Sequence, residues 1–400
     1  MRPLVRFPGN RSTLRMPLDH SRSGQRSTAV EVSTPARLHI GMLSFGVPEV
    51  RAYGGVGFMI DRPGVHLRIT RSDRFAARGP LALRALECAR ACAEAWGLGE
   101  TAACEIEVMR VPDSHAGLGS GTQLGLAVAA GVRHLFHPST VGKTSATPSP
   151  GKTSAAPSPA DGSPCSSDGP WLFENSDALE LARAAGRGRR SCIGVYGFSG
   201  GGMIVEGGRL LRDDHAGEND TSRTFSPLVA RVRLPAEWRC VVIGQSGAIG
   251  LHGDPEKQAF ALLPPVPMEI SAELSRIALM DLLPAAIEGR FVEFSEAVFR
   301  YGLLAGKPFE RASSRLAHAE ATLRLIERLR DMGVHGAAQS SWGPTVMACC
   351  ASLAAAEQLV ERFAEAGLTR HYDTLIAGFD NQGAVLREIR SDQAGTTGSP

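Results

Sequence analysis

The amino-acid sequence predicts an α+β protein with two domains. Up to about residue 235, segments with strand patterns mix with segments with helical patterns, whereas the remainder consists mainly of long helical patterns and closes with a strand, a helix and a strand. Runs rich in β-branched residues and bounded by Gly or Pro indicate strands, and amphipathic periodicity indicates helices. With 400 residues and 43% hydrophobic content, the chain can form two cores.

The predicted elements follow in chain order. In the first domain, strands are expected at residues 28–43, 55–61, 64–71 and 103–111, and helices at residues 81–96 and 177–186. In the second domain, we expect helical segments at residues 271–306 and 314–333, a strand at 345–350, a helix at 353–367 and a strand at 371–379. We therefore expect an N-terminal domain at residues 31–234 and a C-terminal domain at residues 235–390.

Three segments lack any such pattern. Residues 1–30 hold six arginines and one acid, Asp19, so we expect a disordered basic leader, with contact to nucleic acid or a role in targeting as the alternative. Within residues 142–168, GKTSATPSP is repeated as GKTSAAPSP, which predicts a flexible insertion. This insertion is not expected to be a P-loop, because the upstream glycine and the preceding strand of that motif are missing. Residues 391–400 are expected to form a flexible tail.

Composition limits the partners that we expect. The formal net charge is only +2, so no overall field favours nucleic acid or an anionic membrane. No apolar stretch approaches the roughly 18 residues that span a bilayer, and no signal peptide is evident. We therefore expect a soluble, cytoplasmic protein. The eight cysteines form no C-x-x-C pair and no zinc-type cluster, so most are expected to be small buried apolar residues.

A glycine-rich turn, PDSHAGLGSGTQL, spans residues 112–124. It follows a predicted strand and precedes Leu124, Val128 and Val132, which recur at helical spacing. Unpaired N–H groups at a helix start bind anions, and glycines let a ligand come close. We therefore predict a phosphate or diphosphate site, formed by Gly117, Gly119, Ser120, Gly121, Thr122 and Gln123. A Walker loop is excluded because no lysine follows, and a dinucleotide fold is disfavoured because no acid occurs between Asp113 and Asp161.

The turn resembles the phosphate loop of the GHMP kinase superfamily. Pro112, Gly117, Leu118, Gly119 and Ser120 match that loop. Gly121 replaces the second serine of the usual form, which puts an ordinary ATP reaction in doubt. The resemblance implies a GHMP-type two-domain fold with the ligand site in the cleft between the domains.

Several separate blocks extend the resemblance to a particular family, the β-ribofuranosylaminobenzene 5′-phosphate synthases of methanopterin biosynthesis. These blocks lie at residues 36–46, 53–64, 115–129, 187–208, 250–260 and 336–346. Such enzymes join phosphoribosyl pyrophosphate to a para-substituted benzoate, 4-hydroxybenzoate or 4-aminobenzoate, and release pyrophosphate and carbon dioxide. The resemblance further implies Mg²⁺ and a homodimer.

The resemblance also suggests roles for residues within these blocks. Guanidinium groups bind phosphates as forks, so we expect further phosphate contacts from Arg187, Arg189 and Arg190. The substrate-binding candidates are Arg37, Arg51, Gly54, Gly55, Gln339, Ser340, Ser341 and Trp342. Candidates for proton transfer are His39, His252 and Glu256, with Asp254 as a further oxygen donor for Mg²⁺. Neither the general base nor the metal ligands follow from the sequence.

Two other functions stay open. One is an ATP-dependent small-molecule kinase on the same scaffold. Many superfamily kinases place an aspartate near the second glycine-rich block, but this chain has no acid between Gly186 and Gly202. The other is a phosphate-ligand sensor without catalysis, because a fold does not by itself define a function.

Overall fold

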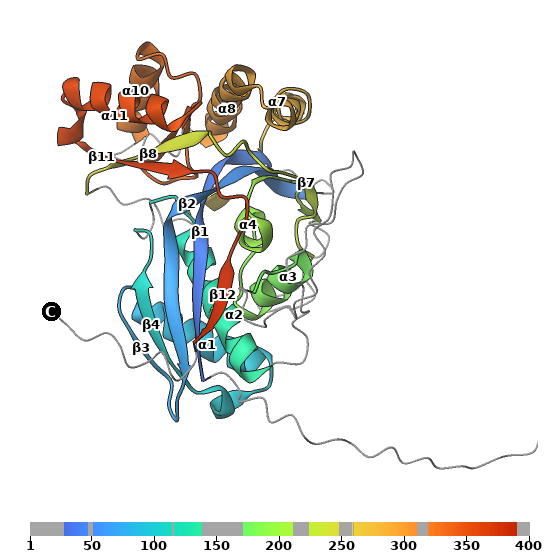
Figure 1. Cartoon of the computed structure of the whole chain (residues 1–400). Helices are drawn as coiled ribbons and strands as arrows, with labels where there is room; N and C mark the ends of the chain where they lie inside the picture. The colour runs from blue at the N-terminus through green and yellow to red at the C-terminus, as the bar shows by residue number, and fades with distance from the viewer. Residues whose placement is uncertain are drawn as a thin grey trace, which may run out of the picture.

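The structure is a computed structural model that describes residues 28–46, 51–113, 116–137, 171–210, 224–247, 258, 260–309 and 319–389. The chain forms two lobes, which are joined by two long strands (Figure 1). Most of the expected leader, the whole 142–168 insertion and the 391–400 tail lie outside the described residues. His252, Asp254 and Glu256 also lie outside them.

The first lobe is built on a mixed sheet. Its main strands are β1 (Ala29–Ser44), β2 (Arg51–Arg71), β3 (Ala76–Arg78), β4 (Cys104–Arg110) and β12 (Val385–Ile389), in the order β12-β1-β2-β4-β3. The upper part of β2 pairs with β5 (Met203–Glu206) and β6 (Arg209–Leu210), and β5 pairs with β7 (Leu228–Val232). The strand segments expected at residues 55–61 and 64–71 belong to the single strand β2.

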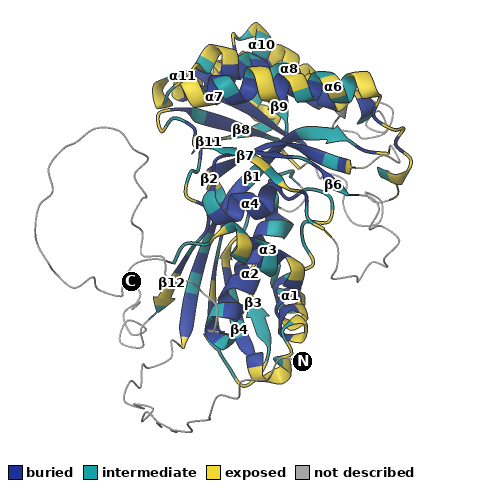
Figure 2. Cartoon of the chain, turned by 90° about the vertical axis from the view of Figure 1, so that its right-hand side faces the viewer, coloured by how far each residue is buried: buried dark blue, intermediate teal, exposed yellow. Residues whose placement is uncertain are grey.

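Four helices cover one face of this sheet. They are α1 (Ala82–Ala95), α2 (Ser120–Phe136), α3 (Asn175–Ala184) and α4 (Ile193–Gly200). Helix α2 lies at the centre and is buried along most of its length (Figure 2). Its small and aliphatic side chains pack against β1 and β2, and Gly131 lets the helix approach Ile69 closely. The helices predicted at residues 81–96 and 177–186 are confirmed as α1 and α3.

The second lobe contains an antiparallel sheet of β11 (Tyr372–Gly378), β8 (Arg239–Gln245), β10 (Thr345–Cys350) and β9 (Ala337–Gln339), in that order. One face packs on α10 (Ala319–Asp331) and α11 (Leu353–Glu365). The other face contributes to the core between the lobes, where Met347 joins Leu38 and Phe58 of the first sheet and Phe294 of α8 (Phe291–Gly306). A continuous apolar core therefore holds the two lobes together.

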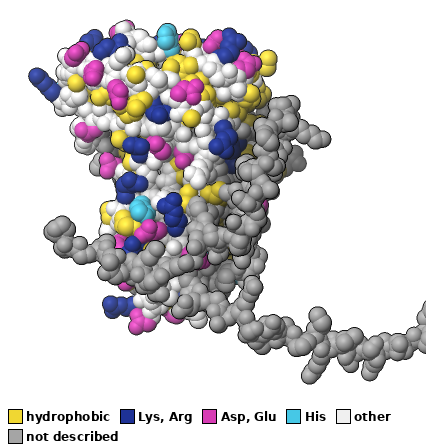
Figure 3. Space-filling view, viewed as in Figure 1, with side chains coloured by type: hydrophobic (Ala, Val, Ile, Leu, Met, Phe, Trp, Pro, Cys, Tyr) yellow, Lys and Arg dark blue, Asp and Glu magenta, His cyan; other side chains and the backbone are white. Residues whose placement is uncertain are grey.

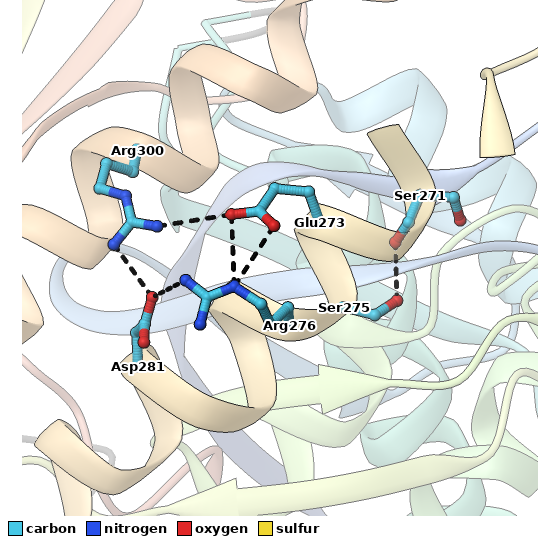
Figure 4. A network of polar contacts seen from close by, with 6 residues as sticks. All are labelled: Ser271, Glu273, Ser275, Arg276, Asp281 and Arg300. Carbon is cyan, nitrogen blue, oxygen red and sulfur yellow. Dashed lines mark hydrogen bonds and ion pairs between the residues drawn. The ribbon is translucent and has the colours of Figure 1, made fainter. Parts of the chain in front are cut away.

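The long helical pattern at residues 271–306 is divided into four pieces. These are α6 (Met268–Arg276), a π-helical stretch (Ile277–Leu282), α7 (Leu283–Glu288) and α8 (Phe291–Gly306). Pro284 lies in the first turn of α7, and Gly289 ends that helix with a φ of 70°. Arg276 and Arg300 bridge Glu273 and Asp281 across these pieces (Figure 4). The network is partly exposed, so it contributes little to stability.

The last described strand returns to the first lobe. After β11, the chain crosses back and β12 pairs with the outer half of β1, with Ala29 opposite Ile389. The segment predicted at residues 235–390 thus supplies a strand to the first sheet. This short strand, VLREI, also forms an isolated bridge to Trp171 through Leu386.

The distribution of charged side chains and the burial of the cysteines agree with what the composition predicted. Basic and acidic side chains are interspersed over the upper lobe (Figure 3). Among the described residues, no helix is both long and apolar enough to cross a membrane. The seven cysteines in these parts of the chain are free and buried.

Candidate functional site

The glycine-rich turn leads directly into α2, and its residues Gly117, Leu118 and Gly119 form the bend before the helix. Gly119 is the residue before the helix, with a φ of 72°, and Gly117 has a φ of 90°. A side chain at Gly117 would overlap the carbonyl oxygen of Ser340, and a Cβ at Gly119 would lie 3.0 Å from the Cβ of Arg37. Both positions therefore require glycine, for conformation as well as for space. The predicted helix start is confirmed, and the atoms that lie close to the two glycines belong to Ser340 and Arg37.

Strand β1 and the loop after β9 converge on this bend. The Arg37 N–H donates to Leu118 O at 3.0 Å, and the Ser340 hydroxyl donates to Gly117 O at 2.7 Å. The Ser340 hydroxyl also accepts the His39 N–H at 3.1 Å. Residues more than 200 positions apart are thus joined by short hydrogen bonds between the two lobes.

A side-chain contact completes this junction. Arg37 Nη2 donates to Ser341 Oγ at 2.9 Å, and the Ser341 N–H donates to His39 O at 2.8 Å. Ser341 has a φ of 55°, which is unfavourable for a residue other than glycine. The hydrogen bonds to Arg37 and His39 stabilise this unfavourable backbone conformation of Ser341. The result is a guanidinium group directly beside the start of α2, where the helix dipole is positive.

His39 lies on the face of β1 opposite to Leu38 and Ile40. It is buried, its Nε2 has no hydrogen-bond partner, and its Nδ1 lies 3.4 Å from Ser341 Oγ. Burial, together with the Arg37 charge, lowers the pKa of His39 to about 3. The imidazole is therefore neutral at physiological pH.

Gly55 allows the second strand to pass close to this histidine, whereas Gly54 lies against the backbone of Glu206 and Gly208. The φ values of Gly54 and Gly55 are 59° and 154°, and the preceding Tyr53 has a φ of 71°. A side chain at Gly55 would overlap Gly41 O, and its Cβ would lie 3.1 Å from His39 Nε2. Arg51 is exposed, and its Nη1 donates to Gly208 O at 2.8 Å. The structure brings Gly55 to the site, whereas the contact seen for Arg51 fixes the edge of β2.

Sequence reasoning missed Glu206, the last residue of β5. It is fully buried and lies opposite Gly55, on the face that carries α4. Its Oε2 accepts the Cys192 N–H at 2.7 Å, while its Oε1 makes no hydrogen bond. Burial raises the pKa of this carboxyl group, and the neighbouring polar groups of Ser191, Cys192 and Ser226 and the Arg37 charge offset only part of that effect. Its only trace in the sequence is the acidic residue of MIVEGG, which lies four residues after the segment between Gly186 and Gly202 that contains no acid.

Other predicted phosphate ligands point in different directions. Gln123 is buried and donates to Gly194 O at 2.8 Å, so its side chain links α2 to α4. The methyl group of Thr122 faces the same glycine. The guanidinium group of Arg190 lies 5.1 Å from the centre of the Phe260 ring, whereas Arg187 lies against α2 at Gly125. Arg187 and Arg190 therefore do not lie together at the bend.

Trp342 belongs to an aromatic cluster next to the junction, which consists of Phe45, Tyr53, Phe260, Phe309 and Trp342. The ring centres of Trp342 and Phe309 are 5.3 Å apart, in an edge-to-face arrangement. Gln339 donates to Gly343 O at 3.0 Å and so stabilises the loop that carries Ser340 and Ser341.

No metal centre is visible among the residues for which the structure gives positions: these contain no group of three His, Cys, Asp or Glu side chains suited to a metal. The suggested oxygen donors Asp254 and Glu256 fall outside that part of the chain. Their role as ligands stays a prediction.

The fold is similar to that of GHMP kinases. A model of the GHMP kinases C-terminal domain matches residues 282–368. Homoserine kinase from Cytophaga hutchinsonii superposes with a TM-score of 0.54 at 16% identity, covering 90% of this chain and 97% of that chain. Phosphomevalonate kinase from Streptococcus pneumoniae superposes with a TM-score of 0.54 at 13% identity, covering 88% and 99%. The α+β GHMP-type fold is thus confirmed, and the cleft as ligand site stays a prediction.

Sequence comparison identifies a narrower set of relatives. The chain is 29% identical over 344 residues to β-ribofuranosylphenol 5′-phosphate synthase of Archaeoglobus fulgidus, covering 84% of this chain and 94% of that protein. The corresponding synthase of Methanothermobacter thermautotrophicus is 28% identical over 327 residues, covering 79% and 87%. The chain is a homologue of these synthases, so the resemblance inferred from the separate sequence blocks is confirmed.

Proposed function

We propose that the protein is a decarboxylating ribosyltransferase, an enzyme of the pentosyltransferase class. It condenses phosphoribosyl pyrophosphate with a para-substituted benzoate and releases pyrophosphate and carbon dioxide. The support is the homology to the archaeal synthases along most of both chains. Structural similarity to kinases supports the fold alone. The reaction belongs, on this proposal, to methanopterin biosynthesis in the cytoplasm.

The observation that carries the proposal is the junction at the start of α2. Arg37, held by Ser341, lies beside the backbone of the bend at Gly119. A helix start and a guanidinium group both stabilise an anion, and together they suit a leaving diphosphate. The diphosphate departs as the bond to the sugar carbon breaks, so stabilisation of its growing charge lowers the barrier.

The aromatic substrate is proposed to bind next to the aromatic cluster around Trp342, which follows Ser341 directly in the chain. Ring faces and edges there offer apolar contact for a benzoate ring. The names of the archaeal relatives specify a ribofuranosylphenol, which carries a ring hydroxyl. This favours 4-hydroxybenzoate over 4-aminobenzoate as the substrate.

The reaction needs a proton acceptor. As the ring carbon that bears the carboxylate bonds to the sugar, the carbon–oxygen bond to diphosphate breaks and diphosphate keeps the electron pair. Carbon dioxide then leaves, and the electrons of that bond restore the aromatic ring. Loss of the hydroxyl proton makes the ring a better nucleophile, and its return gives the phenol. Glu206, with a pKa raised by burial, suits both steps, and neutral His39 lies on the same face.

Mg²⁺ is proposed to accompany the diphosphate, where its charge would stabilise the leaving group. The described residues offer no three-donor set for it. Asp254 and Glu256 therefore remain the proposed protein donors, together with oxygens of the substrate.

A homodimer is likewise proposed only from the family resemblance, and light scattering in solution would test it.

The test uses purified protein, phosphoribosyl pyrophosphate and Mg²⁺ with each benzoate labelled at the carboxyl carbon. We expect labelled carbon dioxide and pyrophosphate in equal amounts, and more with 4-hydroxybenzoate. ATP with a hydroxylated substrate serves as the kinase comparison. Consumption of ATP without labelled gas would support the kinase, and stabilisation by phosphoribosyl pyrophosphate without any product would support the sensor.

A further inference from the structure

Two arginines lie along α2 on the side that faces α1. The guanidinium group of Arg84, from α1, occupies the space beside Gly121, where a Cβ would lie 2.8 Å from Nη2. The side chain of Arg187 occupies the space beside Gly125, where a Cβ would lie 2.9 Å from Nε. Gly121 and Gly125 are four residues apart, so the two arginines lie over successive turns of the same helix face.

The electrostatics of this arrangement favour a bound anion. The pKa of Arg187 is lowered, first by burial and then by the charge of Arg84, with a smaller effect of Arg189. Arg187 Nε is buried without a hydrogen-bond partner. Within the described ranges, neither Arg84 nor Arg187 pairs with a carboxylate. Like charges gathered at the positive end of a helix repel one another unless an anion compensates them.

This basic pair lies apart from the junction at Arg37 and Ser341. The junction contacts Gly117 and Gly119 and faces the loop of the second lobe, whereas Arg84 approaches from α1. At about 1.5 Å per residue, Gly121 and Gly125 lie about 3 Å and about 9 Å along the helix from Gly119. The sugar substrate of the proposed reaction has two anionic ends, and only the diphosphate end reacts.

We propose that Arg84 and Arg187 form a second anion subsite, which binds the 5′-phosphate of the ribose while the bend binds the diphosphate. The inference rests on the proposed function for the identity of the sugar. The subsite also explains why a glycine occupies position 121. A serine there would intrude on the guanidinium group of Arg84, so the second serine of the usual phosphate loop has been exchanged for an additional phosphate ligand.

The experiment separates the two ends of the substrate. Isothermal titration calorimetry on the full chain measures ribose 5-phosphate and inorganic pyrophosphate individually, with wild type, Arg84→Gln and Arg187→Gln. We expect each variant to weaken ribose 5-phosphate binding roughly 10- to 100-fold, because a charge-assisted hydrogen bond is lost. Pyrophosphate affinity should stay within about threefold. Arg90→Gln, on the same helix and exposed, is the matched control and should change neither affinity.

The variant Gly121→Ser keeps both arginines but displaces the guanidinium group of Arg84. It should therefore weaken the binding of ribose 5-phosphate by a similar factor. Thermal unfolding of each variant verifies that it folds. Weaker pyrophosphate binding with unchanged ribose 5-phosphate binding in Arg84→Gln overturns the proposal, as does no measurable binding of ribose 5-phosphate by the wild type.

The inference and the proposed function fail in different ways. If ribose 5-phosphate binding depends on Arg84 but neither benzoate is turned over, the subsite is supported and the ribosyltransferase is rejected. If turnover is found and Arg84→Gln leaves ribose 5-phosphate affinity unchanged, the ribosyltransferase is supported and the subsite is rejected.

Discussion

Gly55 in β2 lies directly opposite Glu206 in β5, and because this glycine has no side chain its backbone passes close to Gly41 and to the imidazole of His39. His39 Nε2 and Glu206 Oε1 are both buried without a hydrogen-bond partner. Buried polar atoms are nearly always paired with a hydrogen-bond partner. Two unpaired buried atoms on the same face of a sheet therefore indicate groups that bind a substrate. The three strands thus bring a carboxyl group and an imidazole to the same face of the sheet.

Replacement of Glu206 by glutamine is expected to lower kcat roughly 10²- to 10⁴-fold, the usual size of general acid–base catalysis. An amide oxygen can still accept the Cys192 N–H, so the fold should be kept. The wild-type rate should rise with pH as the carboxyl group ionises, and this limb should vanish in the variant. Steady-state kinetics from pH 5 to 9 test this. A variant with wild-type kcat and an unchanged profile would limit Glu206 to a structural role.

The same substitution has an effect on stability that does not depend on activity. The ordinary pKa of the carboxyl group is 4.5, and burial raises it in the folded state. Below pH 4.5 the group is protonated in both states. As the pH rises toward the folded pKa, the unfolded chain loses the proton first, so the wild type becomes less stable. Denaturant unfolding should show that the wild type loses stability relative to Glu206→Gln as pH rises. A difference that grows in favour of the wild type would contradict a raised pKa.

The bend predicts a contrast between two left-handed glycines. Gly119 and Gly97 have φ values of 72° and 65°, but only Gly119 has neighbours in the space of a Cβ, since Gly97 has nothing within 4 Å. Valine at either position should cost about 1–3 kcal/mol of stability from backbone strain. Only Gly119→Val should also abolish pyrophosphate binding, and Ser120→Ala should reduce turnover only modestly. Calorimetry with pyrophosphate checks this, and equal affinities in both valine variants would remove the bend from the site.

Deletion of residues 142–168 should leave kcat and KM nearly unchanged, because a segment of Pro, Ser, Thr and Gly contributes little to a core. The same assays apply, with thermal unfolding as a measure of folding. Loss of turnover in a folded deletion variant would show that the segment takes part in the reaction.

The parts of the site that the sequence predicted are those with local signals. Gly117, Gly119 and Ser120 form a motif within a few residues, and Arg37 and His39 lie in one strand with an alternating pattern. Ser340 and Ser341 came from the family resemblance, which supplied the contact over more than 200 residues that spacing alone cannot reveal.

Glu206 and Arg84 could not be found in the same way. Glu206 is one acid at a strand end, and its burial depends on pairing between β5 and β2. Arg84 reads as a surface charge on an amphipathic helix until α1 packs beside Gly121. Helix α4 was also missed, because VYGFSG is poor in residues that favour helices. These features arise from packing between elements.

The most direct test of the central claim is a crystal structure of the protein with phosphoribosyl pyrophosphate. We predict that diphosphate oxygens lie within hydrogen-bond distance of the backbone N–H groups at the start of α2 and of the Arg37 guanidinium group. A structure with the diphosphate bound elsewhere and the start of α2 without ligand would contradict the account.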